Sequence, residues 1–211
     1  METWQWKLAH DRVLSLGPEA VVMGILNLTP DSFSDGGRYA GVDAAVAAAR
    51  AMVADGAAII DIGGESTRPG AAPVDAAEEQ RRVLPVIEAL AADPEMILSI
   101  DTYRAQTARA AVQAGVHIVN DVWGLQKDRS IADLAAATGA GLVVMHTGRE
   151  REKLPDVIAD QFSFLRQSLE IASAAKVADE QIVLDPGFGF AKDHAENLEI
   201  MARLPELAGL G

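Results

Sequence analysis

The chain has 211 residues, 49% of them hydrophobic and 23% charged, which is long enough to bury one sizeable core and short enough for a single domain over residues 1–211. Its formal net charge of -13 argues against nucleic acid as a partner, because phosphate contacts need basic side chains. The lack of cysteine excludes disulfides and thiolate chemistry, and with no run of about 18 apolar residues and no secretory signal we expect a soluble, cytoplasmic protein without membrane contacts.

The first twenty residues differ in pattern from the rest of the chain. Trp4 and Trp6, then Leu14 and Leu16, occupy alternating positions, which predicts a small hairpin able to cover the bottom of a barrel. From residue 21 onward, short apolar runs alternate with longer Ala-rich segments of helical spacing, a pattern typical of repeated βα units. We predict strands over 21–26, 58–62, 97–100, 117–120, 142–146 and 182–184, and helices over 42–55, 75–91, 104–114, 130–138, 153–175 and 194–207.

Several predicted helices carry recognisable ends. Gly56, Gly115 and Gly139 each follow a periodic segment, where a left-handed C-terminal cap favours glycine. Asp75 and Glu78 have the spacing of a capping box at the start of the second helix. These signals support an α/β fold, and we expect a TIM-type (β/α)8 barrel of which six βα units are present, preceded by the hairpin.

Long polar and glycine-rich segments follow the strands, whereas the connections from helix back to strand are short. In a parallel barrel the loops after the strands build the site at the C-terminal face of the barrel. An open doubly wound sheet would bind its ligand at the same strand ends, so the expected position of the site does not depend on the choice between these folds.

Three later strands end on a short polar residue, namely Asp101, Asn120 and Asp185. Each could simply cap the following helix. Together they would offer several acceptors and one mixed donor and acceptor, which suits a flat heterocycle with N–H and NH2 groups on one edge. His146, at the end of another strand, is a weaker candidate for the site. His117 is interpreted as a structural residue, and Lys192 as a cation at a helix start or on the surface.

Two long motifs and three short ones resemble the pterin-binding signatures of the dihydropteroate synthase family. The long ones are Gly-Ile-Leu-Asn-Leu-Thr-Pro-Asp-Ser-Phe-Ser-Asp-Gly at 24–36 and Asp-Ile-Gly-Gly-Glu-Ser-Thr-Arg-Pro-Gly at 61–70. The short ones are Ser-Ile-Asp-Thr at 99–102, Val-Asn-Asp at 119–121 and Leu-Asp-Pro-Gly-Phe-Gly-Phe at 184–190. The resemblance covers the chain from residue 21 onward.

The resemblance implies a transferase of folate biosynthesis and a target of sulfonamides. It would join (7,8-dihydropterin-6-yl)methyl diphosphate to 4-aminobenzoate, giving 7,8-dihydropteroate and diphosphate, with Mg2+ assisting. The pterin pocket would use Asp101, Asn120 and Asp185, with a two-point contact from Asp185. Asn27 would hold the metal and diphosphate, and Thr67 the pterin diphosphate. We expect the bond from the methylene carbon to the diphosphate to break before the amine attacks, with Asp101 and Asp185 favouring the cation.

The resemblance also suggests roles for the two long loops. Phe33 and Ser34 from the first, with Arg68 and Pro69 from the second, are predicted to close over the 4-aminobenzoate side together with Thr67 and exclude water. Met145 and Phe190 are candidates for the walls of the pterin pocket. For Met145 the alternative is a plain role in the core.

A closed barrel of this class has eight strands and typically about 250 residues, so the sequence supplies six βα units and would lack the last two. In the family those units bring a Ser-Arg-Lys-Ser-like and an Arg-x-His segment, and neither occurs after residue 190. We therefore expect a barrel truncated at its C-terminus. The family's tendency to form homodimers through late barrel helices makes a homodimer a further expectation.

Two other functions fit the same motifs less well. A methyltetrahydrofolate-dependent corrinoid methyltransferase shares the pterin-binding barrel, but it would have no need of loops suited to a diphosphate and an arylamine. A non-catalytic pterin-binding paralogue would bind pterin without turnover.

Overall fold

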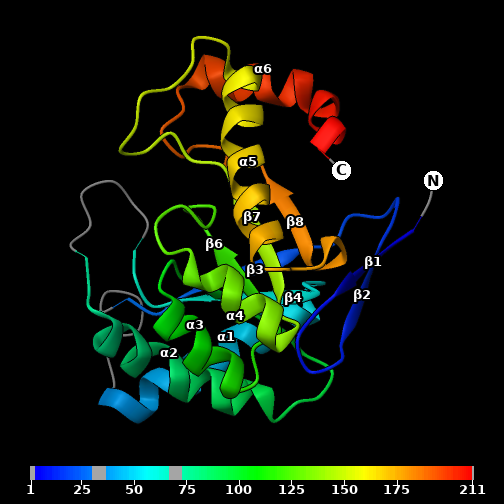
Figure 1. Ribbon diagram of the computed structural model, residues 1–211. Coiled ribbons are helices and arrows are strands. Elements are labelled where there is room, and N and C mark those ends of the chain that lie inside the picture. The colour runs from blue at the N-terminus through cyan, green and yellow to red at the C-terminus, as the bar shows by residue number, and fades with distance from the viewer. Residues whose placement is uncertain (1–2, 30–36, 67–72, 211) are drawn as a thin grey trace.

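The computed structural model describes residues 3–29, 37–66 and 73–210, and it is built around one parallel sheet (Figure 1). The strands pair in the order of the sequence, β3-β4-β5-β6-β7-β8, so every neighbouring pair is joined by a crossover. Their bounds are β3 Met23–Asn27, β4 Ile59–Gly63, β5 Ile97–Asp101, β6 Ile118–Asp121, β7 Gly141–Met145 and β8 Ile182–Asp185. All six predicted strands are confirmed, each displaced by no more than two residues at either end.

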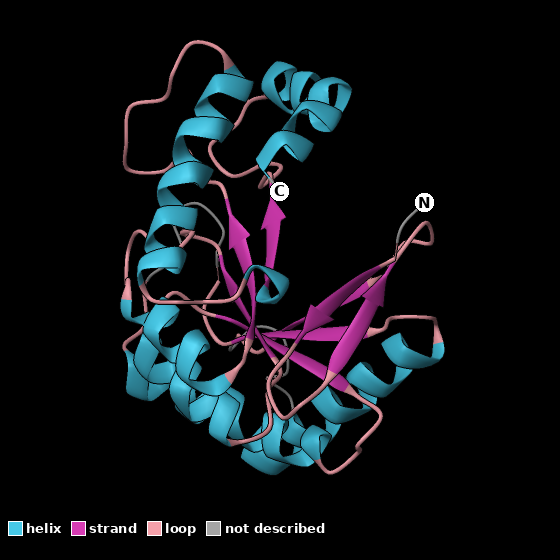
Figure 2. Cartoon of the chain, turned by 45° about the vertical axis from the view of Figure 1, so that its right-hand side comes forward, coloured by secondary structure: helices cyan, strands magenta, loops and turns pink. Residues whose placement is uncertain are grey.

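Helices follow each strand and cover the outer face of the curved sheet (Figure 2). Most of the buried apolar side chains lie between these two layers, with leucine, isoleucine and valine from the strands against alanine-rich helix faces. The helices are α1 Gly37–Ala54, α2 Ala76–Ala91, α3 Ala105–Gln113, α4 Ser130–Thr138, α5 Val157–Ala174 and α6 His194–Arg203, with short 3-10 turns at Asp179–Gln181 and Leu204–Leu210.

The helix ends differ from the predictions for local reasons. Asp156, whose carboxylate accepts from the backbone N–H groups of Ile158 and Ala159, starts α5 four residues later than predicted. Pro205 follows α6, where the chain continues as a 3-10 turn. Asp75 caps α2 as predicted, but the Glu78 carboxylate binds arginines instead of completing the capping box.

The predicted N-terminal hairpin is confirmed, with β1 Trp4–Lys7 paired antiparallel to β2 Val13–Leu16. Trp6 and Leu8 pack against the first inward-facing layer of the sheet, and the Trp6 indole donates to the carbonyl of Gln181 at 2.8 Å. A side chain at Gly141 would lie 2.5 Å from Leu8, so the glycine lets the turn between β1 and β2 approach β7. The inward-facing layer that Trp6 and Leu8 cover consists of Ile59, Ile97, Ile118 and Val143. The hairpin therefore closes the bottom of the barrel interior.

Within the described residues the sheet has two free edges, β3 and β8. Ile25 of β3 pairs in register with Asp61, so it faces the interior, yet it is 64% exposed. The interior is thus accessible from the β3 side. Among the helices of the described segments, none combines the length and apolar character needed to cross a bilayer.

His117 fixes the bottom of the sheet from a position just before β6. Its Nδ1 accepts from the backbone N–H of Leu98 at 3.1 Å, and its own carbonyl accepts from Ala9 and Gly141. Burial, then the neighbouring His10 and Arg12, lowers the pKa of His117 from 6.5 to about 4. The structural role predicted for this histidine agrees with these contacts.

Replacing His117 by Gln is expected to weaken the acid dependence of stability. The folded chain keeps this imidazole neutral, while the unfolded chain protonates it below pH 6.5. The stability that the neutral imidazole gives the fold is therefore fully present above pH 6.5 and is lost as the pH falls towards 4. In urea unfolding between pH 6.5 and 4.5, the unaltered chain should lose about 1.4 kcal/mol per pH unit more than His117→Gln. His194→Gln, at an exposed histidine, is the control. Parallel profiles for all three proteins would contradict the assignment.

Candidate active site

The polar strand ends meet at one rim of the sheet because the strands run in register. Asn27 pairs with Gly63, Gly63 with Asp101, and Asp101 with Asn120. Further along the sheet, Met145 pairs with Asp185. The structure thus brings together all the described residues that the sequence predicted for the pterin pocket and metal, with Phe190 in the loop after β8.

Gly63 leaves the space in which two of these side chains approach. A Cβ atom at this position would lie 3.1 Å from Asn27 Oδ1 and 3.7 Å from Asp101 Oδ2. The strand that carries Gly63 is buried along its whole length. A neutral amide oxygen and a carboxyl oxygen therefore converge over this glycine.

Asp101 lies in a strongly acidic surrounding. Burial raises its pKa well above the ordinary value, and the nearby Asp61, Asp121, Glu79 and Glu65 act in the same direction. The Asp101 carboxyl therefore holds its proton to a higher pH than a free aspartate does, and a ligand that brings N–H groups or positive charge would favour its ionised form. Asp101 is suited to a cationic or N–H-rich ligand.

Asp61, which was not among the residues predicted from the sequence, lies on the inward face of β4 below the rim. Its Oδ2 accepts from Asn120 Nδ2 at 2.9 Å, and burial raises its pKa. The signal was in the strand itself, since Ile60 and Ile62 point outward into the core while the position between them is a carboxylate. A buried carboxyl on a face that packs against no helix needs a polar partner inside the barrel.

Asp185 is held by the turn that follows β8. Its Oδ1 accepts from the backbone N–H of Gly187 at 2.7 Å. Gly187 has a φ of 64°, and a Cβ there would overlap the carbonyl oxygen of His146 and touch Met145. The turn therefore requires glycine and presses the β8 end onto β7. Met145, the last residue of β7, is buried and pairs with Asp185, so it is both a core residue and a neighbour of the site.

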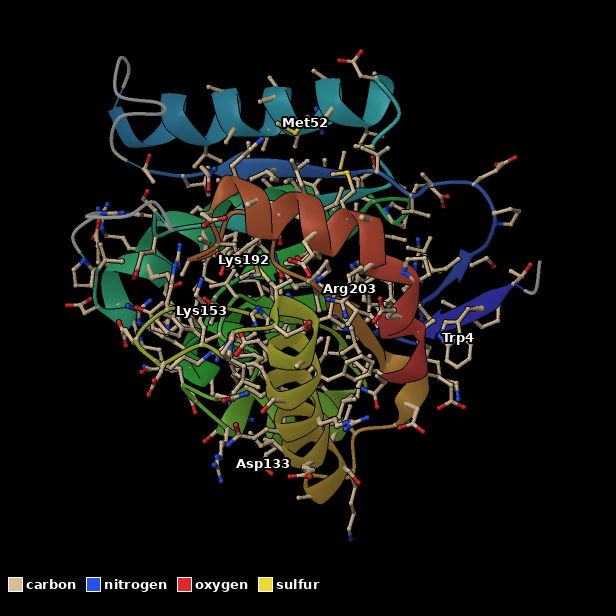
Figure 3. The ribbon with its side chains drawn as sticks, turned by 90° about the horizontal axis from the view of Figure 1, so that it is seen from above. Trp4, Met52, Asp133, Lys153, Lys192 and Arg203 are labelled. Carbon is tan, nitrogen blue, oxygen red and sulfur yellow. The ribbon has the colours of Figure 1, made fainter. Side chains whose placement is uncertain are left out.

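Lys192 is not a free surface cation, because its amine turns back against the carbonyls of the loops after β7 and β8. It donates to the carbonyls of Gly187, Phe190 and His146 at 2.7, 3.3 and 3.4 Å. Burial lowers its pKa to about 8, while Asp185 supports the charged form. Lys153 joins the same region by donating to Ala191, and Figure 3 labels both lysines. No residue spacing in the sequence indicates this inward turn.

His146 belongs to a buried polar cluster beside the site and does not face it as a free base. Its Nε2 lies 2.9 Å from Asp160 Oδ2, and Arg151 binds both oxygens of the same carboxylate. Burial, followed by the charge of Lys192, lowers the pKa of His146 to about 4. Arg151 further donates to the carbonyl of Thr147. The cluster holds the loop after β7 in place.

A second network fastens the start of the loop that follows β4. Glu65 accepts from Arg104 at 2.7 Å and from the Tyr103 hydroxyl at 3.0 Å. Arg104 also reaches the buried Glu79, whose carboxylate accepts from Thr107 at 2.6 Å. The start of the β4 loop is thereby tied to the start of α3, next to Asp101.

Five predicted site residues lie outside the described part of the chain, namely Phe33, Ser34, Thr67, Arg68 and Pro69. Phe190 is half-buried, with the Arg149 guanidinium 4.5 Å above its ring. Among the described residues, no group of three or more His, Asp or Glu side chains could hold a metal ion. Asn27 Oδ1 above the open space at Gly63 fits Mg2+, which keeps several waters and takes few protein ligands.

Residues 23–211 match the model of the family described as pterin binding enzyme. Dihydropteroate synthase of Bacillus subtilis is 48% identical over 209 residues, which is 98% of this chain and 73% of that protein. The dihydropteroate synthase of Clostridium beijerinckii is 44% identical over 93% of this chain and 73% of its own length.

Solved structures agree with these relatives. Dihydropteroate synthase of Xanthomonas albilineans, solved with 4-aminobenzoic acid, has a TM-score of 0.90 and 43% identity, covering 98% of this chain and 76% of that one. The enzyme from Clostridium difficile, solved in the presence of pteroic acid, has a TM-score of 0.88 and 47% identity. The match covers 92% of this chain and 74% of that one. This chain therefore spans about three quarters of the length of the relatives it matches.

The parallel α/β sheet with amide and carboxyl groups at its strand ends, together with the family match over residues 23–211, places the chain in the class of pterin-binding barrel enzymes. Within that class, the chain belongs to the dihydropteroate synthase family, the transferases of folate biosynthesis.

Replacing Arg104 by Gln is expected to destabilise the chain by roughly 2 to 3 kcal/mol, because it leaves the buried Glu79 without its cation. The loss should stay below that of a fully buried pair, since the Arg104 side chain is 17% exposed. Arg81→Gln, at a pair whose arginine is 57% exposed, should leave the free energy of unfolding within error. Equal effects of the two changes in urea unfolding would contradict the tethering role of Arg104.

Proposed function

We propose that the chain condenses (7,8-dihydropterin-6-yl)methyl diphosphate with 4-aminobenzoate, and that the rim from Asn27 to Asp185 forms its active site. The observation that carries this proposal is the alignment of Asn27, Asp101 and Asn120 at one level of the sheet, with Gly63 of β4 between the first two in the strand register. Structures of related synthases contain 4-aminobenzoic acid and 7,8-dihydropteroate, which supports the same two substrate classes here.

The pterin would bind by its hydrogen-bonding edge. Asp185 offers two oxygens, one already accepting from Gly187, whose remaining lone pairs can accept from the ring N–H and the amino group. Asp101 becomes more acidic as positive charge develops on the ring, because the ionised carboxylate then gains an opposite charge nearby. In this way both carboxyls would favour the transition state over the neutral ring.

The metal and the diphosphate would lie at the β3 side. Asn27 is the residue that would hold Mg2+, and its amide oxygen points into the space left by Gly63. When bound, Mg2+ supplies positive charge that stabilises the leaving diphosphate. Thr67 is proposed to contact the same diphosphate.

The two long loops are proposed as lids. Phe33 and Ser34 from the first, with Arg68 and Pro69 from the second, would cover the arylamine and keep water from the reacting carbon. Met145 and Phe190 are proposed as walls for the pterin ring, since the first is buried beside Asp185 and the second lies in the loop after β8.

Cytoplasmic location and a homodimer are proposals that rest on family resemblance. On α6, Leu198 and Met201 are exposed one helical turn apart, a surface on which a second copy could pack. Cell fractionation and the molecular mass of the purified chain in solution test the two proposals.

Mixing the purified chain with both substrates and Mg2+ is expected to release diphosphate, because the rim provides the groups that bind and polarise the pterin. Asp101→Asn and Asp185→Asn should each reduce kcat/KM by about 100-fold or more, as expected for a lost transition-state contact of roughly 3 kcal/mol. Diphosphate release is followed with a coupled phosphate assay.

Asp133→Asn, at an exposed position on α4 labelled in Figure 3, is the matched control and should retain the rate of the unaltered chain. A chelator should stop release and added Mg2+ should restore it, with Asn27→Ala requiring more Mg2+. Tight pterin binding without any turnover would instead support a binding paralogue.

Substituting alanine for Phe33 or Pro69 is expected to raise the KM for 4-aminobenzoate by about 10-fold, since each change removes apolar cover worth roughly 1.4 kcal/mol. The KM for the pterin diphosphate should change far less. Steady-state kinetics with each substrate varied in turn separates the two effects. An unchanged KM for 4-aminobenzoate in both variants would rule out the proposed lid role.

A further inference from the structure

The loop between β8 and α6 turns back on itself around a lysine amine. Lys192 Nζ donates to the carbonyls of Gly187 and Phe190 within this loop, and to the carbonyl of His146 directly after β7. An ammonium group has three N–H donors, and three carbonyl oxygens are present to accept them. One cation therefore joins the ends of two neighbouring strands.

The backbone adopts an unfavourable conformation to place the amine there. Ala191, directly before Lys192, has a φ of 54°, in the left-handed region that a residue with a Cβ atom rarely adopts. Such a conformation persists only where the surrounding contacts outweigh its cost. The amines of Lys153 and Lys192 supply these contacts, the first by donating to the Ala191 carbonyl at 2.9 Å and the second by its bonds to the loop.

Gly187 connects the lysine to Asp185. Its carbonyl accepts from Lys192 at 2.7 Å, and its N–H donates to Asp185 Oδ1 at 2.7 Å. The lysine thus holds the residue that holds the carboxylate. Because a Cβ atom at Gly187 would overlap the carbonyl oxygen of His146, this part of the turn already lies directly against the end of β7.

We propose that Lys192 is a positioning residue for Asp185: its ammonium group holds the loops after β7 and β8 together, and catalysis requires that this group carries its proton. The inference rests on the proposed function and adds the origin of an alkaline limit to it. A neutral amine is a weaker donor, because it lacks the charge that strengthens bonds to carbonyl oxygens. The turn is then free to relax at Ala191, and Asp185 loses its fixed position.

The proton is lost within a pH range that kinetics can cover. Burial lowers the pKa of Lys192 to about 8, although nearby carboxylates favour its charged form. The charged and titratable groups that face the amine come from β8, α5 and the end of β7 with its loop, namely Asp185, Asp160, His146, Arg151 and Lys153.

Two of these neighbours keep the same protonation state around pH 8. Burial lowers the pKa of His146 to about 4, and despite burial the hydrogen bonds from Arg151 lower the pKa of Asp160 to about 2. The three bonds of the Lys192 ammonium group are therefore at full strength below pH 8 and are weakened as the pH rises through that value.

The test measures kcat/KM for diphosphate release between pH 6.5 and pH 10, in the unaltered chain and in Lys192→Met, which has a similar length and no charge. At pH 7 the variant should be slower by about 10-fold or more, since the turn has lost a charged donor. The ratio of the two values should fall towards unity above pH 8, because the lysine is then neutral as well. Taking the ratio cancels any titration that both proteins share.

Two further variants separate charge from bulk. Lys192→Arg keeps a cation with several N–H donors throughout the assay range, so the fall in kcat/KM above pH 8 should be absent. Lys153→Met, at the other lysine labelled beside it in Figure 3, removes a contact to Ala191 but leaves the Lys192 bonds, so the alkaline fall should remain. Thermal unfolding of each variant verifies that the fold is retained.

A measurement without substrates follows the turn itself. The Gly187 amide reports on the turn because it donates to Asp185. Its NMR chemical shift should change with a midpoint near pH 8 in the unaltered chain, where Lys192 titrates, and should stay constant in Lys192→Met.

The two measurements distinguish failure of the inference from failure of the proposed function. An alkaline fall of equal size and midpoint in Lys192→Met, or a Gly187 resonance that titrates alike in both proteins, overturns the positioning role and leaves the proposed function intact. Absence of diphosphate release at every pH contradicts the proposed function, and the Gly187 titration then decides whether the charge of Lys192 holds the turn.

Discussion

The parallel register of the sheet is the constraint on which the site depends. Because Asn27, Gly63, Asp101 and Asn120 are paired across four consecutive strands, their spacing is set by backbone hydrogen bonds and not by loops. A shift of one residue in any strand would turn these side chains into the helix layer and carry outward residues such as Ile62 or Ile100 to the interior. The apolar packing of the outer layer therefore holds the polar rim in place.

The two faces of the same strands serve opposite purposes. On the outward face, Ile60, Leu98 and Val119 join the core against the helices. On the inward face, an apolar layer sealed by the N-terminal hairpin lies below Asp61 and Ser99, and the rim lies above them. Polarity thus increases from the hairpin towards the strand ends, and both carboxyls are desolvated from below. The Asn120 amide that donates to Asp61 comes from β6, two strands away from β4. This gradient explains the raised pKa values of Asp61 and Asp101.

The sequence was sufficient to predict the six strands, the hairpin and the rim, because each depends on short-range periodicity or on a polar residue at a strand end. It was not sufficient for Lys192, whose inward turn depends on carbonyls supplied by two different loops. Nor did it identify the tether from Arg104 to Glu65 and Glu79, which joins residues far apart in the chain. For Asp61 the sequence was sufficient in part. The alternation within β4 indicates its inward-facing position, but nothing in the sequence indicates its partner Asn120 on β6.

A net charge of -13 would be a poor basis for binding an anion if the charge were evenly spread. It is not: carboxyls gather around the ends of β4 to β6, whereas Arg151 and Lys192 lie at the ends of β7 and β8. The partly buried Lys192 amine keeps its charge because Asp185 and Asp160 lie nearby, and that charge holds the carbonyls of both loops together. Removing its proton would leave a weaker donor among three carbonyls and an uncompensated Asp185 beside the site. The same cation therefore shapes the turn that presents Asp185 and balances the charge of its carboxylate.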